Sequence, residues 1–232
     1  WIHPSIDAYT VACHAAKETL VAEGVSGGKI NVLGIPISMQ FLKKYDKKDI
    51  AAERGFRLDM PSILVMGGGL GFGPIKDIVR ELDNLESPSQ LIVVCGGNKH
   101  LYDWFSARKN SFRKPIFIYG YIDFINKLMD FSDIIITKAG GITVSEALSK
   151  RMAIIIINPI PGQEERNVNY LKSRNALINA DSIKNISSIV EELLHDQDKL
   201  LSIKTAAELN SLINSSLNLA DFILNFDAQE TK

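Results

Sequence analysis

The sequence predicts an α/β protein built around a Rossmann-like parallel sheet that is covered by helices. Short runs of β-branched residues alternate with segments of helical period along most of the 232 residues, which is the pattern of βα units. Two of these runs lead directly into glycine-rich turns, the usual place for a ligand in such sheets. The predicted strands are residues 9–12, 30–33, 63–66, 91–95, 116–119, 134–137, 153–157 and 176–179.

The composition excludes several classes of protein. A hydrophobic content of 46% with 23% charged residues is typical of an ordinary globular chain, and the formal charge of −1 gives no reason to expect a nucleic-acid partner. Cys13 and Cys95 lack the spacing of a zinc site and indicate a reducing cytoplasm. The longest apolar run, residues 153–157, is far shorter than the roughly 20 residues of a membrane-spanning helix, so we expect any membrane contact to be peripheral.

The chain begins without an initiator methionine and reaches its first predicted strand within a few residues. We therefore interpret residues 1–36 as the tail of a preceding domain, most of which is expected to be missing. Residues 37–60 are interpreted as a linker with a first helix, and residues 61–226 as a self-contained α/β domain. Residues 227–232 are interpreted as a polar tail.

The last part of the predicted domain, residues 183–226, has no strand signal and predicts two or three helices. Apolar residues from Leu209 to Leu224 follow a helical spacing, which predicts that they share the final helix. Asp196 and Asp198 form an Asp-x-Asp sequence between two of these helices. We interpret them as helix-capping residues and not as a metal site.

The predicted strand 63–66 runs into the first glycine-rich turn, where Gly69 and Gly71 precede Pro74. Such a turn lets backbone amides approach a phosphate closely, and Pro74 is well placed to begin a helix. No register fits the G-x-G-x-x-G dinucleotide pattern, and no Gly-Lys-Ser/Thr follows, so neither a Rossmann fingerprint nor a Walker loop is present. A tight turn with close packing of strand and helix is the alternative.

The second glycine turn follows the predicted strand 134–137 and is more informative. After Gly141 and Ile142, the sequence Thr143-Val144-Ser145-Glu146 is expected to open a helix, whose free amides and dipole suit a diphosphate. The Thr143 hydroxyl can add a donor. Glu146 has two candidate roles: it can accept both hydroxyls of a ribose, or it can close a capping box with Thr143 as the N-cap residue.

A third polar segment, residues 158–169, follows the predicted strand 153–157 at its carboxyl end, where open α/β sheets bind ligands. It contains Gln163 and Glu164, and such amide and carboxylate side chains match the donors and acceptors of a sugar. The solvated start of an ordinary helix is the alternative interpretation.

Six motifs follow one another along the chain, at residues 1–9, 34–37, 67–75, 95–98, 137–148 and 159–169. Together they resemble glycosyltransferase family 28, and within it the monogalactosyldiacylglycerol synthases and the processive diacylglycerol glucosyltransferases. The lipid II GlcNAc transferase is a more distant relative that shares mainly residues 143–146. The resemblance implies a GT-B architecture, with an acceptor domain first, a UDP-sugar-binding domain second, and a C-terminal helix that crosses back onto the first.

The resemblance also implies a set of site residues. In such families the backbone at the position of Ile122 holds the uracil, and Glu146 contacts the ribose. The general base is expected in the missing N-terminal region, so no base is assigned here, and His100 is the histidine to test among His3, His14, His100 and His195. The expected nucleotide-binding residues are Gly69, Gly71, Tyr121, Ile122, Gly141, Ile142, Thr143 and Glu146, and the expected sugar-binding residues are Asn98, Gln163 and Glu164.

The activity implied by the resemblance is inverting transfer of glucose or galactose from a UDP-sugar to diacylglycerol or a related glycolipid. We expect no metal or other cofactor, a lipid acceptor at the cytoplasmic face of the membrane, and membrane contact through the missing domain. The chain alone is expected to be inactive. The alternatives are a non-catalytic nucleotide-sugar-binding module and a GT-B protein related to the UDP-GlcNAc transferases and 2-epimerases.

Overall fold

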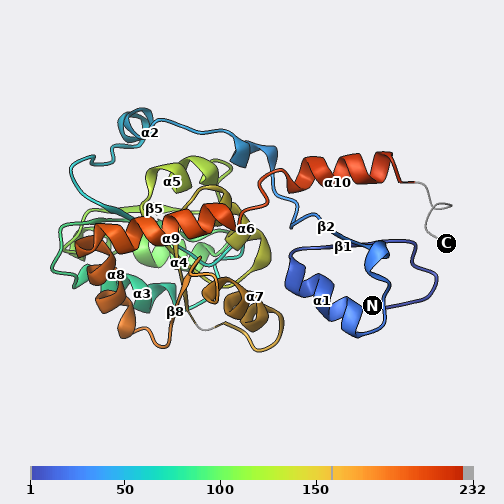
Figure 1. Cartoon of the computed structure of the whole chain (residues 1–232). Helices are drawn as coiled ribbons and strands as arrows, with labels where there is room; N and C mark the ends of the chain where they lie inside the picture. Colours follow the sequence, from blue (N-terminus) through green and yellow to red (C-terminus); the bar gives the residue numbers. More distant parts are fainter. Residues whose placement is uncertain (1, 158, 227–232) are drawn as a thin grey trace. The chain divides into compact units, whose positions relative to one another are not determined.

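A computed structural model describes residues 2–157 and 159–226 (Figure 1), which form two compact units. Unit 1 comprises Trp1–Leu42 with Leu212–Lys232, and unit 2 comprises Lys43–Ser211. The polar tail expected at residues 227–232 lies outside the described residues, as do Trp1 of the first motif and Asn158 of the third polar segment.

Unit 1 contains a short parallel strand pair with two helices and two 3-10 turns (Figure 1). Its last helix belongs to this unit because the Ser215 hydroxyl donates to the Ile35 carbonyl at 2.7 Å and the Ser216 hydroxyl to the Ile37 carbonyl at 2.5 Å. The elements are β1 (Tyr9–Val11), α1 (His14–Ala22), η1 (Gly27–Lys29), β2 (Ile30–Val32), η2 (Met39–Leu42) and α10 (Ser215–Leu224).

Unit 2 is built on a parallel sheet with the strand order β5-β4-β3-β6-β7-β8. The strands are β3 (Ser62–Met66), β4 (Gln90–Val94), β5 (Ile116–Tyr119), β6 (Ile134–Thr137), β7 (Ala153–Ile157) and β8 (Ile178–Ala180). The helical elements are α2 (Lys47–Arg54), α3 (Ile75–Asp83), α4 (Lys99–Ser106), η3 (Lys109–Ser111), α5 (Ile125–Phe131), α6 (Gly141–Ser149), α7 (Gln163–Lys172), α8 (Asn185–His195) and α9 (Gln197–Leu209). The chain proceeds outward from β3 through β4 to β5 and then returns to β6, so the strand order reverses between β3 and β6.

The core of unit 2 lies on both faces of this sheet because successive side chains of a strand point to opposite sides. Ile63 and Val65 of β3 belong to a buried cluster that includes residues of α3 and α8. Leu64 between them is fully buried outside that cluster. Burial on both faces explains why β3, β4 and β7 are continuous apolar runs in the sequence.

The predicted strands are confirmed, with ends that differ by one or two residues. The predicted final helix is wrong in its extent. Leu209 ends α9, and Leu212 lies in the connection before α10, because the backbone turns at residues 210–214. The side chains at Leu209 and Leu224 therefore belong to different helices and to different units.

The expected domain boundaries at residues 36, 60 and 226 do not coincide with the limits of the two units, which lie after Leu42 and after Ser211. Helix α2 belongs to unit 2, where Ile50 and Ala51 are buried, while α10 belongs to unit 1. The sequence predicted a helix in the segment of α2, and its contacts with α5 place it in unit 2. Helix α10 thus belongs to unit 1, although it follows unit 2 along the chain.

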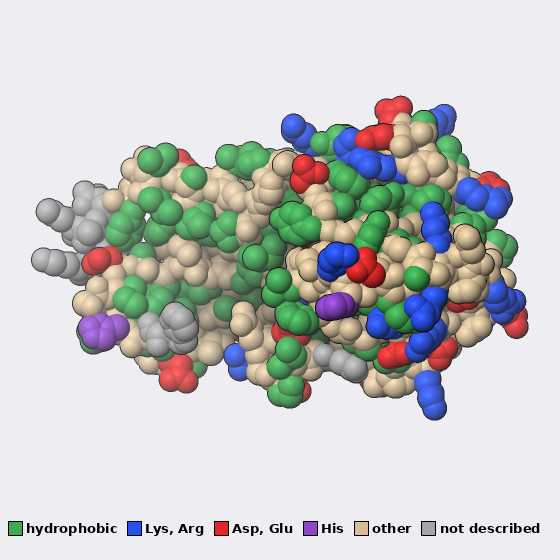
Figure 2. Space-filling view, turned by 180° about the vertical axis from the view of Figure 1, so that it is seen from behind, with side chains coloured by type: hydrophobic (Ala, Val, Ile, Leu, Met, Phe, Trp, Pro, Cys, Tyr) green, Lys and Arg blue, Asp and Glu red, His purple; other side chains and the backbone are tan. Residues whose placement is uncertain are grey.

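The surfaces of the two units differ in character. Unit 1 exposes many large apolar side chains, and Figure 2 shows hydrophobic groups over the left part of the view, while most Lys and Arg side chains gather over unit 2 on the right. The exposed apolar residues of unit 1 are Ile2, Val21, Met39, Leu212, Leu217, Ile223 and Leu224. Within residues 2–157 and 159–226, no helix combines the length and the apolar character that crossing a membrane requires.

Candidate functional site

A cleft of about 420 Å³ lies in unit 2 where the strand order reverses. The carboxyl ends of β3, β4 and β6 reach it, and it receives the turns that follow these strands. Ligands of open α/β sheets bind at such switch points. The cleft is lined by Met66, Gly68, Gly69, Val94, Gly96, Tyr121, Ile122, Ile125, Lys138, Gly140, Gly141, Ile142, Thr143 and Glu146.

Helix α6 points its N-terminus into this cleft. Its first internal hydrogen bond runs from the Val144 amide to the Gly140 carbonyl, so the amides of Gly141, Ile142 and Thr143 have no acceptor among the described residues. Free amides at the positive end of a helix dipole bind anions. The three residues expected to contact a diphosphate are therefore placed together with their donors available.

The start of α6 rules out the capping box at Thr143. The N-cap residue is Gly140, so Thr143 is the third residue of the helix and Glu146 the sixth. A capping box would require Glu146 at the third helical position. The glycine at the N-cap provides no side-chain oxygen, which leaves the amides unoccupied.

Glu146 lines the cleft one turn into α6, and no described donor is bonded to its carboxylate. Burial raises the pKa of Glu146 to about 7 because desolvation disfavours the charged form. Glu146 is half-buried, and a partly desolvated carboxylate without a partner is costly in free energy. Its position suits a ligand that donates hydrogen bonds, such as the hydroxyls of a ribose.

The opposite wall of the cleft is formed by the segment between β5 and α5. Tyr121 is highly exposed, with 78% of its surface accessible, and Ile122 beside it has no backbone hydrogen bond to a described residue. The sequence after Ile122 enters α5 at Ile125. An exposed aromatic ring and a free peptide group are suitable for a flat heterocycle with donors and acceptors on its edge.

Four of the predicted site residues do not line the cleft, and two of these, Gly71 and Asn98, lie at the first glycine turn. Gly71 has a φ of +63°, and a Cβ at this position would lie 1.9 Å from the carbonyl oxygen of Cys95. The Asn98 Oδ1 accepts from the Leu101 amide at 3.0 Å and caps α4, while its Nδ2 donates to the Gly71 carbonyl at 3.3 Å. The structure thus shows both residues in the packing of the first glycine turn against the turn after β4.

A smaller cavity of about 170 Å³ adjoins the cleft and shares Met66 and Lys138 with it. Its walls are largely apolar and include Phe72 and Ile160. The predicted sugar-binding residue Glu164 lies in this cavity, where its Oε1 accepts from the Lys138 ammonium at 3.0 Å. Gln163, also predicted to contact the sugar, is the exposed first residue of α7 and lines neither space.

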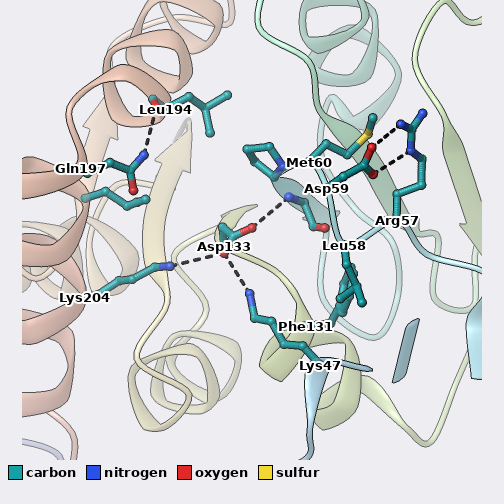
Figure 3. Close-up of a pocket in the computed structure, with 13 residues that line it drawn as sticks. Lys47, Arg57, Leu58, Asp59, Met60, Phe131, Asp133, Leu194, Gln197 and Lys204 are labelled. Carbon is teal, nitrogen blue, oxygen red and sulfur yellow. Dashed lines mark hydrogen bonds and ion pairs between the residues drawn. The ribbon is translucent and has the colours of Figure 1, made fainter. Parts of the chain in front are cut away.

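A third cavity, of about 370 Å³, lies at the opposite edge of the sheet, where β3 and β6 begin (Figure 3). Lys47 and Lys204 both point toward Asp133, with N–O distances of 2.9 and 3.6 Å, and the Ser62 amide donates to the same carboxylate. Nearby, Arg57 forms two hydrogen bonds to Asp59. The charged groups of this cavity have protein partners, which is typical of a structural cluster.

The remaining candidate residues lie away from the cleft. His100 is exposed on α4, and His195 Nδ1 lies 2.8 Å from the Glu191 carbonyl oxygen. The interpretation of Asp196 as a capping residue is confirmed, since its carboxylate accepts from the Lys199 amide at 2.8 Å. Among the residues that the structure describes, no group of three or more His, Cys, Asp or Glu side chains is arranged to hold a metal ion.

Lys138 is the main residue of the site that sequence reasoning gave no role. It follows β6 directly and lines both the cleft and the smaller cavity. A signal was present in its position, because the residue after a central parallel strand emerges at the ligand-binding edge of the sheet. Its ion-pair partner lies 26 residues further along the chain, and no local pattern indicates that pairing.

Together these groups make an anion site beside a carboxylate and an aromatic wall. Three free amides and one lysine favour a phosphate group, the Glu146 carboxylate suits hydroxyl donors, and the segment at Ile122 suits a base. The parallel sheet with its cleft at the switch point gives unit 2 the Rossmann-like architecture of a GT-B domain.

The chain belongs to glycosyltransferase family 28, since the model of the family's C-terminal domain matches residues 62–221. Among curated proteins, it is 32% identical over 225 residues to a processive diacylglycerol beta-glucosyltransferase of Bacillus pumilus and 32% identical over 226 residues to one of Bacillus subtilis. The two alignments each cover 97% of this chain but 58% and 59% of the relatives. The chain thus spans less than two thirds of their length.

Solved structures confirm the fold. MurG of Acinetobacter baumannii is 18% identical, with a TM-score of 0.64 over 95% of this chain and 65% of that one. A co-structure of MnaA from S. aureus with UDP is 15% identical, with a TM-score of 0.69 over 94% of this chain and 60% of that one. At these identities the similarity concerns the fold alone.

Proposed function

We propose that this chain is the donor-binding part of an inverting glycosyltransferase that moves a hexose from a UDP-sugar to diacylglycerol or a related glycolipid. The observation that carries the proposal is the set of three free amides at the start of α6, with the unpartnered Glu146 carboxylate one turn away in the same cleft. Membership of family 28 and the names of the similar curated proteins support the reaction class.

In the proposed complex, the backbone of Ile122 holds the uracil, and Glu146 accepts hydrogen bonds from the ribose hydroxyls. The amides of Gly141, Ile142 and Thr143 bind the diphosphate. The geometry of the cleft supports this order because these groups line one continuous space from the β5–α5 segment to α6. Tyr121 and Gly69 contribute to the walls of the nucleotide site.

The proposed reaction is a single displacement. An acceptor hydroxyl oxygen forms a bond to the anomeric carbon while the bond from that carbon to the diphosphate oxygen breaks and its electron pair stays with UDP. The hydroxyl proton passes to a general base, which we place in the part of the longer relatives that does not align with this chain. Negative charge grows on the leaving diphosphate, so the α6 amides stabilise the transition state more than the ground state.

The proposal includes three further features. The amides provide the charge stabilisation, so we propose that the reaction requires no metal ion. The acceptor is a lipid, so the whole enzyme works at the cytoplasmic face of a membrane, and we propose that its contact comes from outside this chain. The choice between glucose and galactose is left to activity measurements with both donors.

The test is calorimetric titration of the chain with UDP at pH 8, where Glu146 is largely ionised. We expect micromolar-range binding, and Glu146→Ala is expected to weaken it by roughly 1–3 kcal/mol because a hydrogen-bonded charged group is lost. Glu86→Ala, which removes an exposed carboxylate from the loop between α3 and β4, is the matched control and should bind as the parent does.

Repeating the titration with EDTA tests the proposal that no metal ion is required. Loss of binding on chelation would contradict that part alone. If the folded parent chain fails to bind UDP, the nucleotide-sugar assignment of this cleft is wrong.

A further inference from the structure

The Lys138 side chain occupies the boundary between the cleft and the smaller cavity. It lines both spaces, and it is the cationic side chain among the residues that line the cleft. Its ammonium group donates to Glu164 Oε1 at 3.0 Å, while Glu164 Oε2 accepts from the Ile160 amide at 3.2 Å. The charge of Lys138 is therefore paired with a carboxylate that is itself bonded to the loop before α7.

Two glycines show how close Lys138 lies to the anion site. A Cβ built on Gly140, the N-cap residue of α6, would lie 3.4 Å from Lys138 Nζ, and a Cβ on Gly68 would lie 3.5 Å from its Cε. Both glycines line the cleft. The lysine thus passes between the first and second glycine turns, and its ammonium group lies next to the N-cap residue of α6, which directly precedes the free amides.

A bound diphosphate would change the balance of charge around Lys138. Lys138 and Glu164 form an ion pair of zero net charge, with side-chain exposures of 38% and 14%. A diphosphate at the α6 amides carries more negative charge than one carboxylate and lies next to the same ammonium group. Because ammonium groups form their strongest hydrogen bonds with anionic oxygens, the two anions compete for Lys138.

We propose that Lys138 is the cationic group that binds the donor diphosphate, and that Glu164 is its competing counter-ion in the empty site. This inference rests on the proposed function, because it assigns the partner of a residue in the same cleft. Glu164, which the family resemblance assigns to the sugar, is then a positioning residue for Lys138. Binding of a nucleoside diphosphate exchanges the Glu164 contact for a phosphate contact.

The two residues therefore have opposite effects on the affinity for UDP. Lys138→Met keeps much of the apolar length of the side chain but removes the charge, and we expect it to weaken UDP binding about tenfold or more. Glu164→Gln keeps an oxygen acceptor for the Ile160 amide and removes the competing charge. We expect it to strengthen UDP binding about threefold or more, since a charge-assisted bond no longer has to be broken.

Uridine is the control ligand, because it has the base and the ribose but no phosphate. Its affinity is expected to change by less than about twofold in both variants. Glu165→Gln is the matched control variant: it removes a neighbouring, exposed negative charge on α7, and no described cation is paired with it. It should leave UDP binding at the parent value, which separates the specific pair from a general change in charge.

Calorimetric titrations of the whole chain with UDP and with uridine, at low and high salt, test the proposal. The expected result is opposite shifts for Lys138→Met and Glu164→Gln with UDP, a weaker salt dependence in Lys138→Met, and affinity within a few fold of the parent in Lys138→Arg, which keeps the charge. Thermal unfolding of each variant checks that it is folded.

Three outcomes can be distinguished. If the parent binds UDP and uridine equally well, or if Lys138→Met binds UDP as the parent does, the role of Lys138 is wrong while the nucleotide site stands. If Glu164→Gln leaves UDP binding unchanged and weakens only UDP-glucose or UDP-galactose, Glu164 contacts the sugar, and the competition is wrong. If the parent binds neither UDP nor uridine, the proposed function itself fails.

Discussion

Unit 2 has charged groups at the edge of the sheet where the strands begin, the amino edge, and at the edge where they end, the carboxyl edge. The charged groups of the two edges differ in whether they have partners. At the amino edge, Asp133 receives Lys47, Lys204 and the Ser62 amide, so its carboxylate is satisfied (Figure 3). At the carboxyl edge, Glu146 and the first amides of α6 have no partner among the described residues. Cavities of similar size therefore have different meanings: unmet hydrogen-bonding capacity marks a ligand site, and satisfied charge marks a structural cluster.

The largest effect is expected at Gly71, where the carboxyl edge depends on close backbone packing. Gly71→Ala adds a Cβ 1.9 Å from the Cys95 carbonyl oxygen and also strains a positive φ, so we expect a loss of about 4 kcal/mol in the free energy of unfolding. Gly55→Ala is the control, because its φ of +74° imposes similar strain with no atom within 4 Å. It is expected to cost about 1 kcal/mol in urea unfolding, and equal losses in the two variants would contradict the packing role of Gly71.

The next effect concerns the amino edge. Asp133→Asn leaves Lys47 and the desolvated Lys204 without a counter-ion. We expect the free energy of unfolding, measured in urea, to fall by about 3 kcal/mol. Asp59→Asn on the same cavity breaks an ion pair between side chains that are more than half exposed, and we expect it to leave the free energy of unfolding close to the parent value. UDP binding by both folded variants should match the parent. A marked loss of UDP affinity in Asp133→Asn would mean that the two edges are not separate in function.

The smallest of these effects is a pH dependence at the carboxyl edge. The pKa of Glu146 is raised to about 7, so its carboxylate is mostly protonated at pH 6 and mostly ionised at pH 8. Because the ionised form accepts from ribose hydroxyls, uridine affinity is expected to rise about tenfold over this interval. Uridine is preferred to UDP here because a terminal phosphate also titrates near pH 6.

Glu146→Gln is expected to remove this pH dependence, because it removes the carboxyl group whose ionisation causes it. Calorimetry at several pH values measures the effect. A parent affinity that is constant from pH 6 to pH 8 would show that the charge of Glu146 plays no part in binding the nucleoside.

Much of the fold could be predicted because parallel strands buried on both faces are continuous runs of β-branched residues. The strands at Ile134–Thr137 and Ala153–Ile157 are predicted to the residue for this reason. The helix start after Thr137 could also be predicted, because Gly140 and Gly141 follow a strand directly, and free amides at such a start suit an anion. Both features depend on residues that are neighbours in the sequence, and these residues remain neighbours in the folded chain.

Other features depend on contacts between distant residues. Asn98 looks like a polar loop residue suited to a sugar, but its Oδ1 caps α4 and its Nδ2 donates to the distant Gly71 carbonyl, so both ends of the amide have protein partners. The capping-box pattern at Thr143 is a valid local motif, yet α6 begins at Gly141 and places Glu146 in the cleft instead. In both cases the tertiary structure selects one of several arrangements that the local sequence permits.

The sequence by itself determined the α/β class, the strands and the two glycine turns, because side-chain periodicity and backbone freedom are properties of short segments. Only the tertiary structure decided which charges are satisfied: it joined Lys138 to Glu164 and gathered Lys47 and Lys204 around Asp133, while Glu146 was left without a partner. The physical reason is that pairing and desolvation depend on distances across the fold, and these distances exist only once the sheet has brought its edges together.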